Sequence, residues 1–335
     1  MSGHLRPPSH ATPMIRTLDY MQQRGRHPGR LIATMAVATL ASTLSPATAP
    51  PPATAHAPAD TSVDSSPSLT TPALPSPALT LPVDPDSAIQ AIPHRYAGYE
   101  STFDVFVGPV DRSRPVGAMF YFDGDKADEA LLSYNKPLFV AAMTQTAAAH
   151  NLVFIPVHTP LTYDLEGPEY LWWDIRDKGD FARDVAQQAV RMLHLDPRHL
   201  WFTAFSGGAE MVMSELLSHD RDWIKGGGAV VMGGGVAEYG VEPAGAATPD
   251  LRLLWVAGDM DGELEPLGDE WSAQLAARAG FQSYSDAGFR HLSFLTLPGQ
   301  DHGYDIAGVV DMGMARVDPM PPHLSESTRN LAQTP

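Results

Sequence analysis

Ser206 is placed in the sequence as a catalytic nucleophile would be. An apolar run at 200–205 leads directly into it, two glycines follow, and a helix-compatible stretch continues to Leu217. A serine hydroxyl is a weak nucleophile unless a sharp turn exposes it within reach of a base. Small residues two positions to either side, here Ala204 and Gly208, let strand and helix cross closely enough to make that turn. The segment therefore predicts an exposed nucleophile, and the plainer alternative is a serine that caps a helix.

A carboxylate loop and a histidine loop follow downstream. The apolar run 251–257 has the length of a buried strand and ends in a loop that holds Asp259 and Asp261, and the run 291–297 is followed by His302. Catalytic groups gather at the carboxyl edge of a parallel sheet. His302 would take the serine's proton, and a carboxylate would orient the imidazole and stabilise the imidazolium. We favour Asp261 as that acid because it lies further past the strand end, with Asp259 as the alternative.

Such a reaction also needs hydrogen-bond donors for the oxyanion. The N–H of Gly207, directly after the serine, is the first candidate, and the second should come from the loop after the apolar run 116–122. Either Gly124 or Asp125 would supply it. The acidic pattern of this loop superficially suggests calcium, but it lacks the other ligands and the closing glutamate of a calcium loop. We predict no metal and no cofactor.

The segment 180–208 resembles a known family. It runs from Asp180-Phe181-Ala182-Arg183-Asp184-Val185 through Asp196-Pro197-Arg198 to the serine turn. This order is similar to the secreted esterase branch of the α/β-hydrolase superfamily, which includes poly(3-hydroxybutyrate) depolymerases and feruloyl or acetylxylan esterases. The resemblance extends loosely over residues 95–312 and implies the nucleophile, acid and histidine roles for Ser206, Asp261 and His302. The chain departs from the pattern at Ala204, at Asp123-Gly124 where the family usually has His-Gly, and in its lack of cysteine.

The order of apolar and helix-compatible segments predicts an α/β fold. Alternating strands and helices indicate a mostly parallel central sheet with helices on both faces, which is the α/β-hydrolase arrangement. Continuous apolar runs are typical of strands covered on both sides. We expect strands at 101–107, 116–122, 152–157, 199–205, 228–232, 251–257 and 291–297, and helices at 127–150, 181–194, 208–218, 270–279 and 303–314.

The first 90 residues differ from the rest. Residues 1–55 form an N-terminal extension in which basic residues precede an apolar run at 31–44 and then small residues, the pattern of a secretory signal peptide. Cleavage after Ala55 is favoured over Ala49, and an uncleaved anchor is the alternative. Residues 56–90 are rich in Pro, Ala, Ser and Thr, which predicts a disordered linker. Residues 91–335 would then be the catalytic domain.

Composition limits the partners. The chain has no cysteine, which excludes disulfides and a thiol nucleophile. Its net charge of −17 disfavours nucleic acid and anionic membrane surfaces as partners. We expect a secreted monomer with an ester substrate, and no nucleic-acid or membrane partner in the mature form. Glycines at 226–228 and 233–235 flank a strand but open no dinucleotide-binding unit.

An irregular stretch at 158–179 is the expected source of substrate specificity. It holds Trp172 and Trp173, which could form an apolar wall for an acyl group, although either could instead pack the loop onto the core. The sequence thus predicts a secreted serine carboxylesterase that uses an acyl-enzyme intermediate, with polyester depolymerase and feruloyl-type esterase as candidate activities. A serine peptidase or acyltransferase on the same triad, or a catalytically silent binding protein, are the alternatives.

Overall fold

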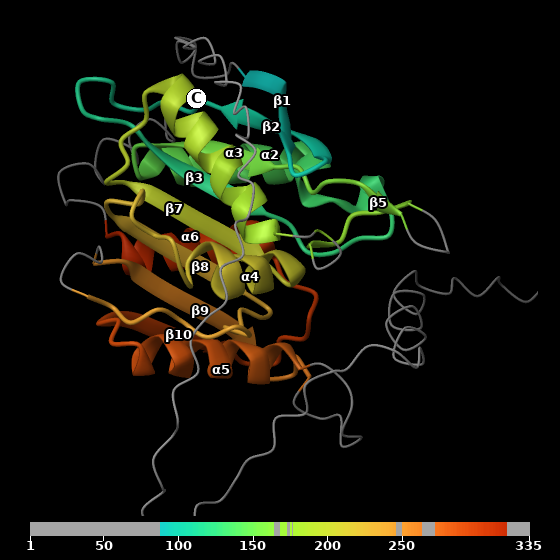
Figure 1. Ribbon diagram of the computed structural model, residues 1–335, viewed down its shortest axis with the longest axis vertical. Helices are drawn as coiled ribbons and strands as arrows, with labels where there is room; N and C mark the ends of the chain where they lie inside the picture. Colours follow the sequence, from blue (N-terminus) through green and yellow to red (C-terminus); the bar gives the residue numbers. More distant parts are fainter. Residues whose placement is uncertain are drawn as a thin grey trace, which may run out of the picture. The chain divides into compact units, whose positions relative to one another are not determined.

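The computed structural model describes residues 88–163, 168–172, 175, 177–245, 250–262 and 272–319 (Figure 1). The predicted N-terminal extension at 1–55 and most of the predicted linker lie outside the described residues, so both stay predictions. The first strand, β1 (Ala88–Tyr96), begins inside the segment expected as linker. The sequence analysis did not predict this strand. It is an edge strand with a proline and an irregular register near Ala91, and such a strand lacks a clean apolar pattern.

The described strands build an eight-stranded sheet in the order β1-β2-β4-β3-β7-β8-β9-β10. β1 pairs antiparallel with β2, and β2 antiparallel with β4, whereas every other neighbouring pair is parallel. The sheet is therefore mostly parallel, as predicted. The remaining strands are β2 (Tyr99–Phe106), β3 (Gly117–Phe122), β4 (Leu152–Val157), β7 (Leu200–Phe205), β8 (Gly227–Met232), β9 (Arg252–Gly258) and β10 (His291–Leu297).

Helices cover both faces of this sheet, with α3 and α4 in front of it and α6 behind it in Figure 1. Alternate residues of one strand face the two sides, so that Phe202 of β7 lies in one apolar cluster and Trp201 in the other. The first cluster includes residues of α3, α4 and α5, and the second includes residues of α2 and α6. The helices are α2 (Pro137–Ala149), α3 (Lys178–Leu193), α4 (Gly207–Met211), α5 (Ala273–Asp286) and α6 (Ile306–Val317), and a π-helical turn, Val212–Leu216, continues α4.

Two helix predictions had bounds that were wrong by more than three residues. The helix expected at 127–150 begins only at Pro137, because the first residues form 3₁₀ turns and proline favours the first helical position. The helix expected at 270–279 continues to Asp286, after a start at which Ser272 accepts a hydrogen bond from the N–H of Leu275. In the stretch expected to be irregular, β5 (Thr162–Tyr163) pairs antiparallel with β6 (Pro168–Glu169).

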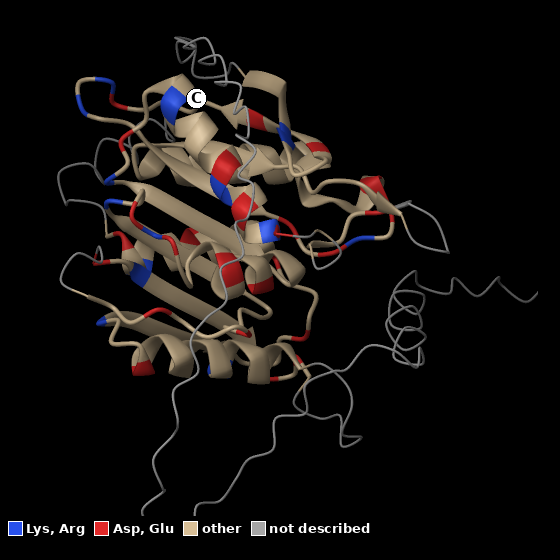
Figure 2. Cartoon of the chain, viewed as in Figure 1, with Lys and Arg blue, Asp and Glu red and all other residues tan. Residues whose placement is uncertain are grey.

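Charged side chains avoid the interior of the sheet. Figure 2 shows acidic and basic residues on loops and on helices, whereas the central strands are almost entirely uncharged. Every residue of β3, β4 and β7 is buried. Because these strands are parallel, their carboxyl ends lie together at one edge of the sheet. The polar loops that carry the candidate catalytic residues begin at this edge. Within the described part of the chain, no helix has the length and apolarity that crossing a membrane requires.

Candidate active site

Ser206 lies on a strained turn between β7 and α4. Its backbone has φ 51° and ψ −121°, a conformation that is uncommon for any residue other than glycine. At this turn, α4 begins close to the backbone at the end of β3. A Cβ added to Gly208 would lie 2.5 Å from the Phe122 carbonyl oxygen and 2.6 Å from that of Asp123. Gly208 is therefore required to be small, for the reason that the sequence pattern indicated, and Ala204 before the turn is fully buried.

The structure brings Ser206, His302 and Asp261 into one hydrogen-bonded chain. His302 Nε2 lies 3.0 Å from Ser206 Oγ, and His302 Nδ1 lies 2.9 Å and 3.1 Å from the two oxygens of Asp261. An ionised carboxylate can only accept, so Nδ1 carries the proton and Nε2 is left to accept from the serine hydroxyl. This is the tautomer in which the imidazole can act as a base toward the serine.

Asp259 and Asp261 have different partners. Asp261 is only 4% exposed and faces His302. Asp259 Oδ1 instead accepts a hydrogen bond of 2.6 Å from the N–H of Gly299, which joins the loop after β9 to the loop after β10. The backbone turns from the end of β9 through both acids, because the N–H of Asp261 donates to the carbonyl of Gly258 at 3.4 Å. Of the two candidates, Asp261 is therefore the one in contact with the histidine.

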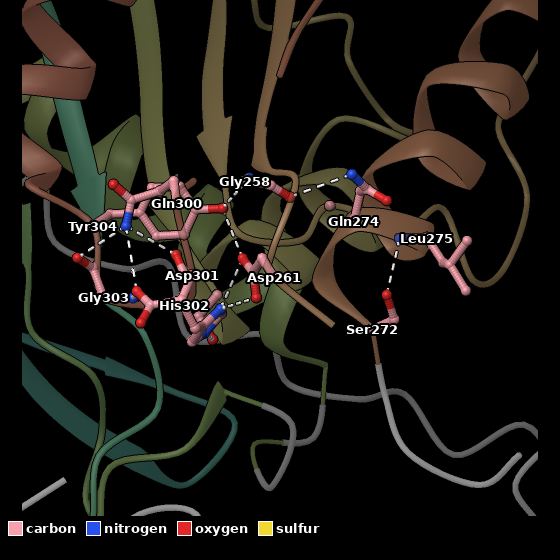
Figure 3. Close-up of polar contacts among 12 residues, drawn as sticks. Gly258, Asp261, Ser272, Gln274, Leu275, Gln300, Asp301, His302, Gly303 and Tyr304 are labelled. Carbon is pink, nitrogen blue, oxygen red and sulfur yellow. Dashed lines mark hydrogen bonds and ion pairs between the residues drawn. The ribbon is translucent and has the colours of Figure 1, made fainter. Parts of the chain in front are cut away.

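Sequence reasoning missed Tyr304, which contacts the same carboxylate. Its hydroxyl donates to Asp261 Oδ2 at 2.7 Å and accepts from the N–H of Gly258 at 2.7 Å. Figure 3 shows the Asp261 carboxylate between His302 and Tyr304. Burial, together with the neighbouring Asp261 carboxylate, raises the pKa of Tyr304 far above its usual value, so the hydroxyl keeps its proton. Its position two residues after His302 was the available signal.

The predicted oxyanion loop lies beside the serine, but one of its N–H groups points elsewhere. A Cβ added to Gly124 would be 3.0 Å from Ser206 Cβ. The Gly124 N–H, however, donates to Asp123 Oδ1 at 2.8 Å, so it is not directed at the serine and the prediction for Gly124 needs correction. The carboxylate of Asp125 covers the Cα of Gly207, where an added Cβ would clash with it.

The acidic side chains of this loop are used as acceptors within the protein. Asp123 is fully buried and accepts from the Tyr121 hydroxyl at 2.9 Å and from the backbone N–H of Ser133. Asp125 Oδ1 accepts from the N–H of Trp172 at 2.6 Å, and Asp128 Oδ1 caps a 3₁₀ turn. The pattern that superficially suggested calcium thus organises the loop between β3 and α2.

Trp172 belongs to the core and not to a substrate wall. It is 1% exposed, its indole N–H donates to the Asp123 carbonyl at 3.1 Å, and its ring packs edge-on against Phe122. The prediction that Trp172 forms a substrate-binding surface is therefore corrected, because its ring is shielded by its own fold. Trp173 lies outside the described residues. Tyr163, from the same stretch, is 76% exposed.

A buried carboxyl group supports the other side of the site. Glu210 of α4 accepts from the N–H of Gly235 at 3.1 Å and from that of Val236 at 2.7 Å. The segment that it holds passes His302, since a Cβ on Gly233 would lie 3.1 Å from the histidine Cε1. Burial raises the pKa of Glu210 to about 7, although the two hydrogen bonds act in the opposite direction. The sequence analysis did not single out Glu210.

Comparison with protein-family models gives no match, and comparison with curated proteins gives none either. Solved structures do resemble the chain. An α/β serine hydrolase without a lid from Xanthomonas campestris is 14% identical, with 72% of this chain and 100% of that chain covered and a TM-score of 0.43. A poly(3-hydroxybutyrate) depolymerase from Bordetella parapertussis is also 14% identical, with 72% and 93% covered and a TM-score of 0.44. A Bacillus cereus carboxylesterase is 15% identical, with 65% and 94% covered and a TM-score of 0.45.

The chain's own topology decides the fold. The mostly parallel sheet is covered by helices on both faces and has a serine on the sharp turn that follows β7. A carboxylate after β9 and a histidine after β10 complete the order serine, acid, histidine that this architecture uses. The chain has the α/β-hydrolase fold. The predicted fold class is therefore confirmed.

Proposed function

We propose that the protein is a serine hydrolase that cleaves carboxylic esters through Ser206, His302 and Asp261. The observation that carries this proposal is the continuous hydrogen-bonded chain from Ser206 Oγ to the Asp261 carboxylate, with distances of 3.0 Å and 2.9 Å on the two sides of the imidazole. A nucleophile, a base within hydrogen-bond reach and a third group that orients the base are the geometric requirements for acyl transfer.

The proposed reaction has two halves. Ser206 Oγ attacks the acyl carbon while its proton passes to His302 Nε2, and the oxyanion that forms accepts from the N–H of Gly207 and from a second donor, for which Asp125 is the candidate. The alcohol then leaves with the proton from His302, and an acyl-enzyme remains. Water attacks this ester with His302 again as base, which releases the acid and restores the serine.

Exposed apolar side chains support an ester with an apolar acyl or alkoxy group. Large exposed apolar side chains occur in the segments that follow the carboxyl ends of four parallel strands, and Ser206 follows the carboxyl end of another parallel strand, β7. They are Leu131 after β3, Leu161 and Tyr163 after β4, Tyr239 after β8 and Met260 after β9. Short acyl esters, feruloyl esters and hydroxybutyrate oligomers are the substrates that we propose to screen.

Ser206→Ala tests the proposal directly. The variant should lose about 10³-fold or more of its ester turnover, because only binding and oxyanion stabilisation remain. It should also fail to react with a fluorophosphonate that labels the parent protein. Ser283→Ala is a matched control, since this serine lies on α5 and its hydroxyl donates to the helix carbonyl of Ala279. A folded Ser206→Ala protein that keeps most of its activity would refute the assignment.

The second candidate class uses the same triad. A peptidase or an acyltransferase also needs an activated serine, so p-nitrophenyl esters should be compared with peptide anilides, and added alcohols should be tested as acceptors. A binding protein without activity would fail to react with the fluorophosphonate.

We further propose export through an N-terminal signal peptide and a monomeric mature form without nucleic-acid or membrane partners. N-terminal sequencing of the exported protein and its molar mass in solution test these points.

A further inference from the structure

Tyr304 contributes two hydrogen bonds where the loops after β9 and β10 meet. Its hydroxyl accepts from the N–H of Gly258, at the end of β9, and donates to Asp261 Oδ2, and both distances are 2.7 Å (Figure 3). Within the described part of the chain, the Asp261 carboxylate accepts from His302 and from this hydroxyl. The phenol therefore connects the backbone of one strand end to the carboxylate that orients the histidine.

We infer that Tyr304 is a positioning residue that holds Asp261 in the orientation that His302 needs and sets the basicity of the pair. This inference rests on the proposed function. Tyr304 acts through Asp261, since its hydroxyl is bonded to that carboxylate. Its ring packs edge-on against Phe205, with centroids 5.7 Å apart, and Phe205 in turn packs against the His302 ring. The ring contact with Phe205 and the two hydrogen bonds of the hydroxyl together hold the phenol in place.

The electrostatic consequence has a definite sign. A hydrogen bond from the phenol withdraws charge from Oδ2, so the carboxylate attracts the imidazolium less strongly than it would alone. Removal of the hydroxyl should therefore favour the protonated histidine. The titratable groups around this network include Asp261, His302, Tyr304 itself and Asp301, whose carboxylate accepts from the N–H of Gly303. They also include Lys126, whose Nζ lies 5.3 Å from the centre of the Phe205 ring. Of these, Asp261 is in direct hydrogen-bond contact with the phenol.

Tyr304→Phe tests the inference, because phenylalanine keeps the ring and removes only the hydroxyl. With an activated aryl ester, kcat per active site should fall by about 10- to 100-fold with little change in KM. Losses of this size are typical when a residue that hydrogen-bonds to a functional side chain, and so orients it, is replaced. The acidic limb of the kcat/KM profile should move upward by about half to one pH unit. Tyr284→Phe is the matched control. It removes a buried hydroxyl that bonds to the Met213 carbonyl, and it should change stability without moving the pH profile.

Two further measurements separate positioning from a merely structural role. In an Asp261→Asn background, Tyr304→Phe should have little additional effect on kcat, since the two residues act as a unit. Replacement of Tyr304 by difluorotyrosine keeps the fold and strengthens the donor, so the acidic limb should move downward. Fluorophosphonate titration counts the active sites in each variant. An unchanged pH profile in both the Phe and the fluorotyrosine proteins, or additive losses with Asp261→Asn, would overturn the inference. Loss of activity in Ser206→Ala with no effect at Tyr304 would leave the proposed function intact.

Discussion

The buried carboxyl of Glu210 should make the stability of the protein depend on pH, whatever its substrate. Its pKa is raised from an ordinary value of 4.5 to about 7, with burial as the largest cause. The folded protein therefore holds a proton on this group at pH values where the unfolded chain has released it. The contribution of Glu210 to stability is fully present below pH 4.5 and is lost as the pH rises from 4.5 to about 7. Above pH 7 the titration of Glu210 changes the stability no further.

The size of the effect follows from the shift. A difference of about 2.5 pKa units, at 1.36 kcal/mol for each unit, gives an upper value of ~3.4 kcal/mol. The Glu210 residue as a whole keeps a small exposed fraction, although its carboxyl is buried against Gly235 and Val236, and this exposure moderates the cost. We therefore expect the free energy of unfolding to fall by roughly 2–3 kcal/mol through this group. Glu210→Gln removes the titration. The stability of the parent protein relative to this variant should therefore decline by that amount across the window.

Urea unfolding of the full chain at fixed ionic strength, in steps between pH 4.5 and 7.5, measures this decline. Glu242→Gln is the control, because this exposed glutamate undergoes the same chemical change at the surface. The absolute stability of Glu210→Gln is less informative, since an amide oxygen cannot replace both carboxylate acceptors for Gly235 and Val236. A parent protein that becomes more stable relative to Glu210→Gln as the pH rises would refute the reasoning. It would mean that the two hydrogen bonds outweigh burial.

Two further predictions concern the serine turn and the acid. Gly208→Ala should destabilise the fold by about 1–3 kcal/mol, because the added Cβ would meet backbone oxygens at 2.5 and 2.6 Å. A Cβ added to Gly245 would meet none of the described residues within 4 Å, so Gly245→Ala should change the stability by less than about 0.5 kcal/mol. Equal urea midpoints for the two variants would contradict this. Asp261→Asn should lower kcat by up to ~10⁴-fold, as loss of the orienting carboxylate does in such triads, while Asp259→Asn should keep most activity in proteins of matched thermal stability. The reverse order would show that Asp259, and not Asp261, is the acid of the triad.

The sequence by itself determined the elements that are governed by local pattern. Continuous apolar runs predicted the central strands, since a strand covered on both faces has no polar side. The small residues around Ser206 predicted the strained turn, because only Ala204 and Gly208 leave room for strand and helix to cross. The chain order of serine, acid and histidine loops was likewise visible without a structure. By contrast, the edge strand β1 was missed, because an exposed strand with a bulge and a proline has no such pattern.

Only the tertiary structure decided which side chains meet. Asp259 and Asp261 follow the same strand, and the loop after β10 determines that one bonds to Gly299 and the other to His302. The same holds for Trp172, which an aromatic loop pattern could place at the surface but which the β3 end and α3 enclose. Glu210 accepts from the backbone of Gly235, 25 residues away in sequence, and its burial raises its pKa. Such partners lie on loops that follow different strands, and these strands are far apart in the chain. Local sequence propensity carries no information about which of these loops come together.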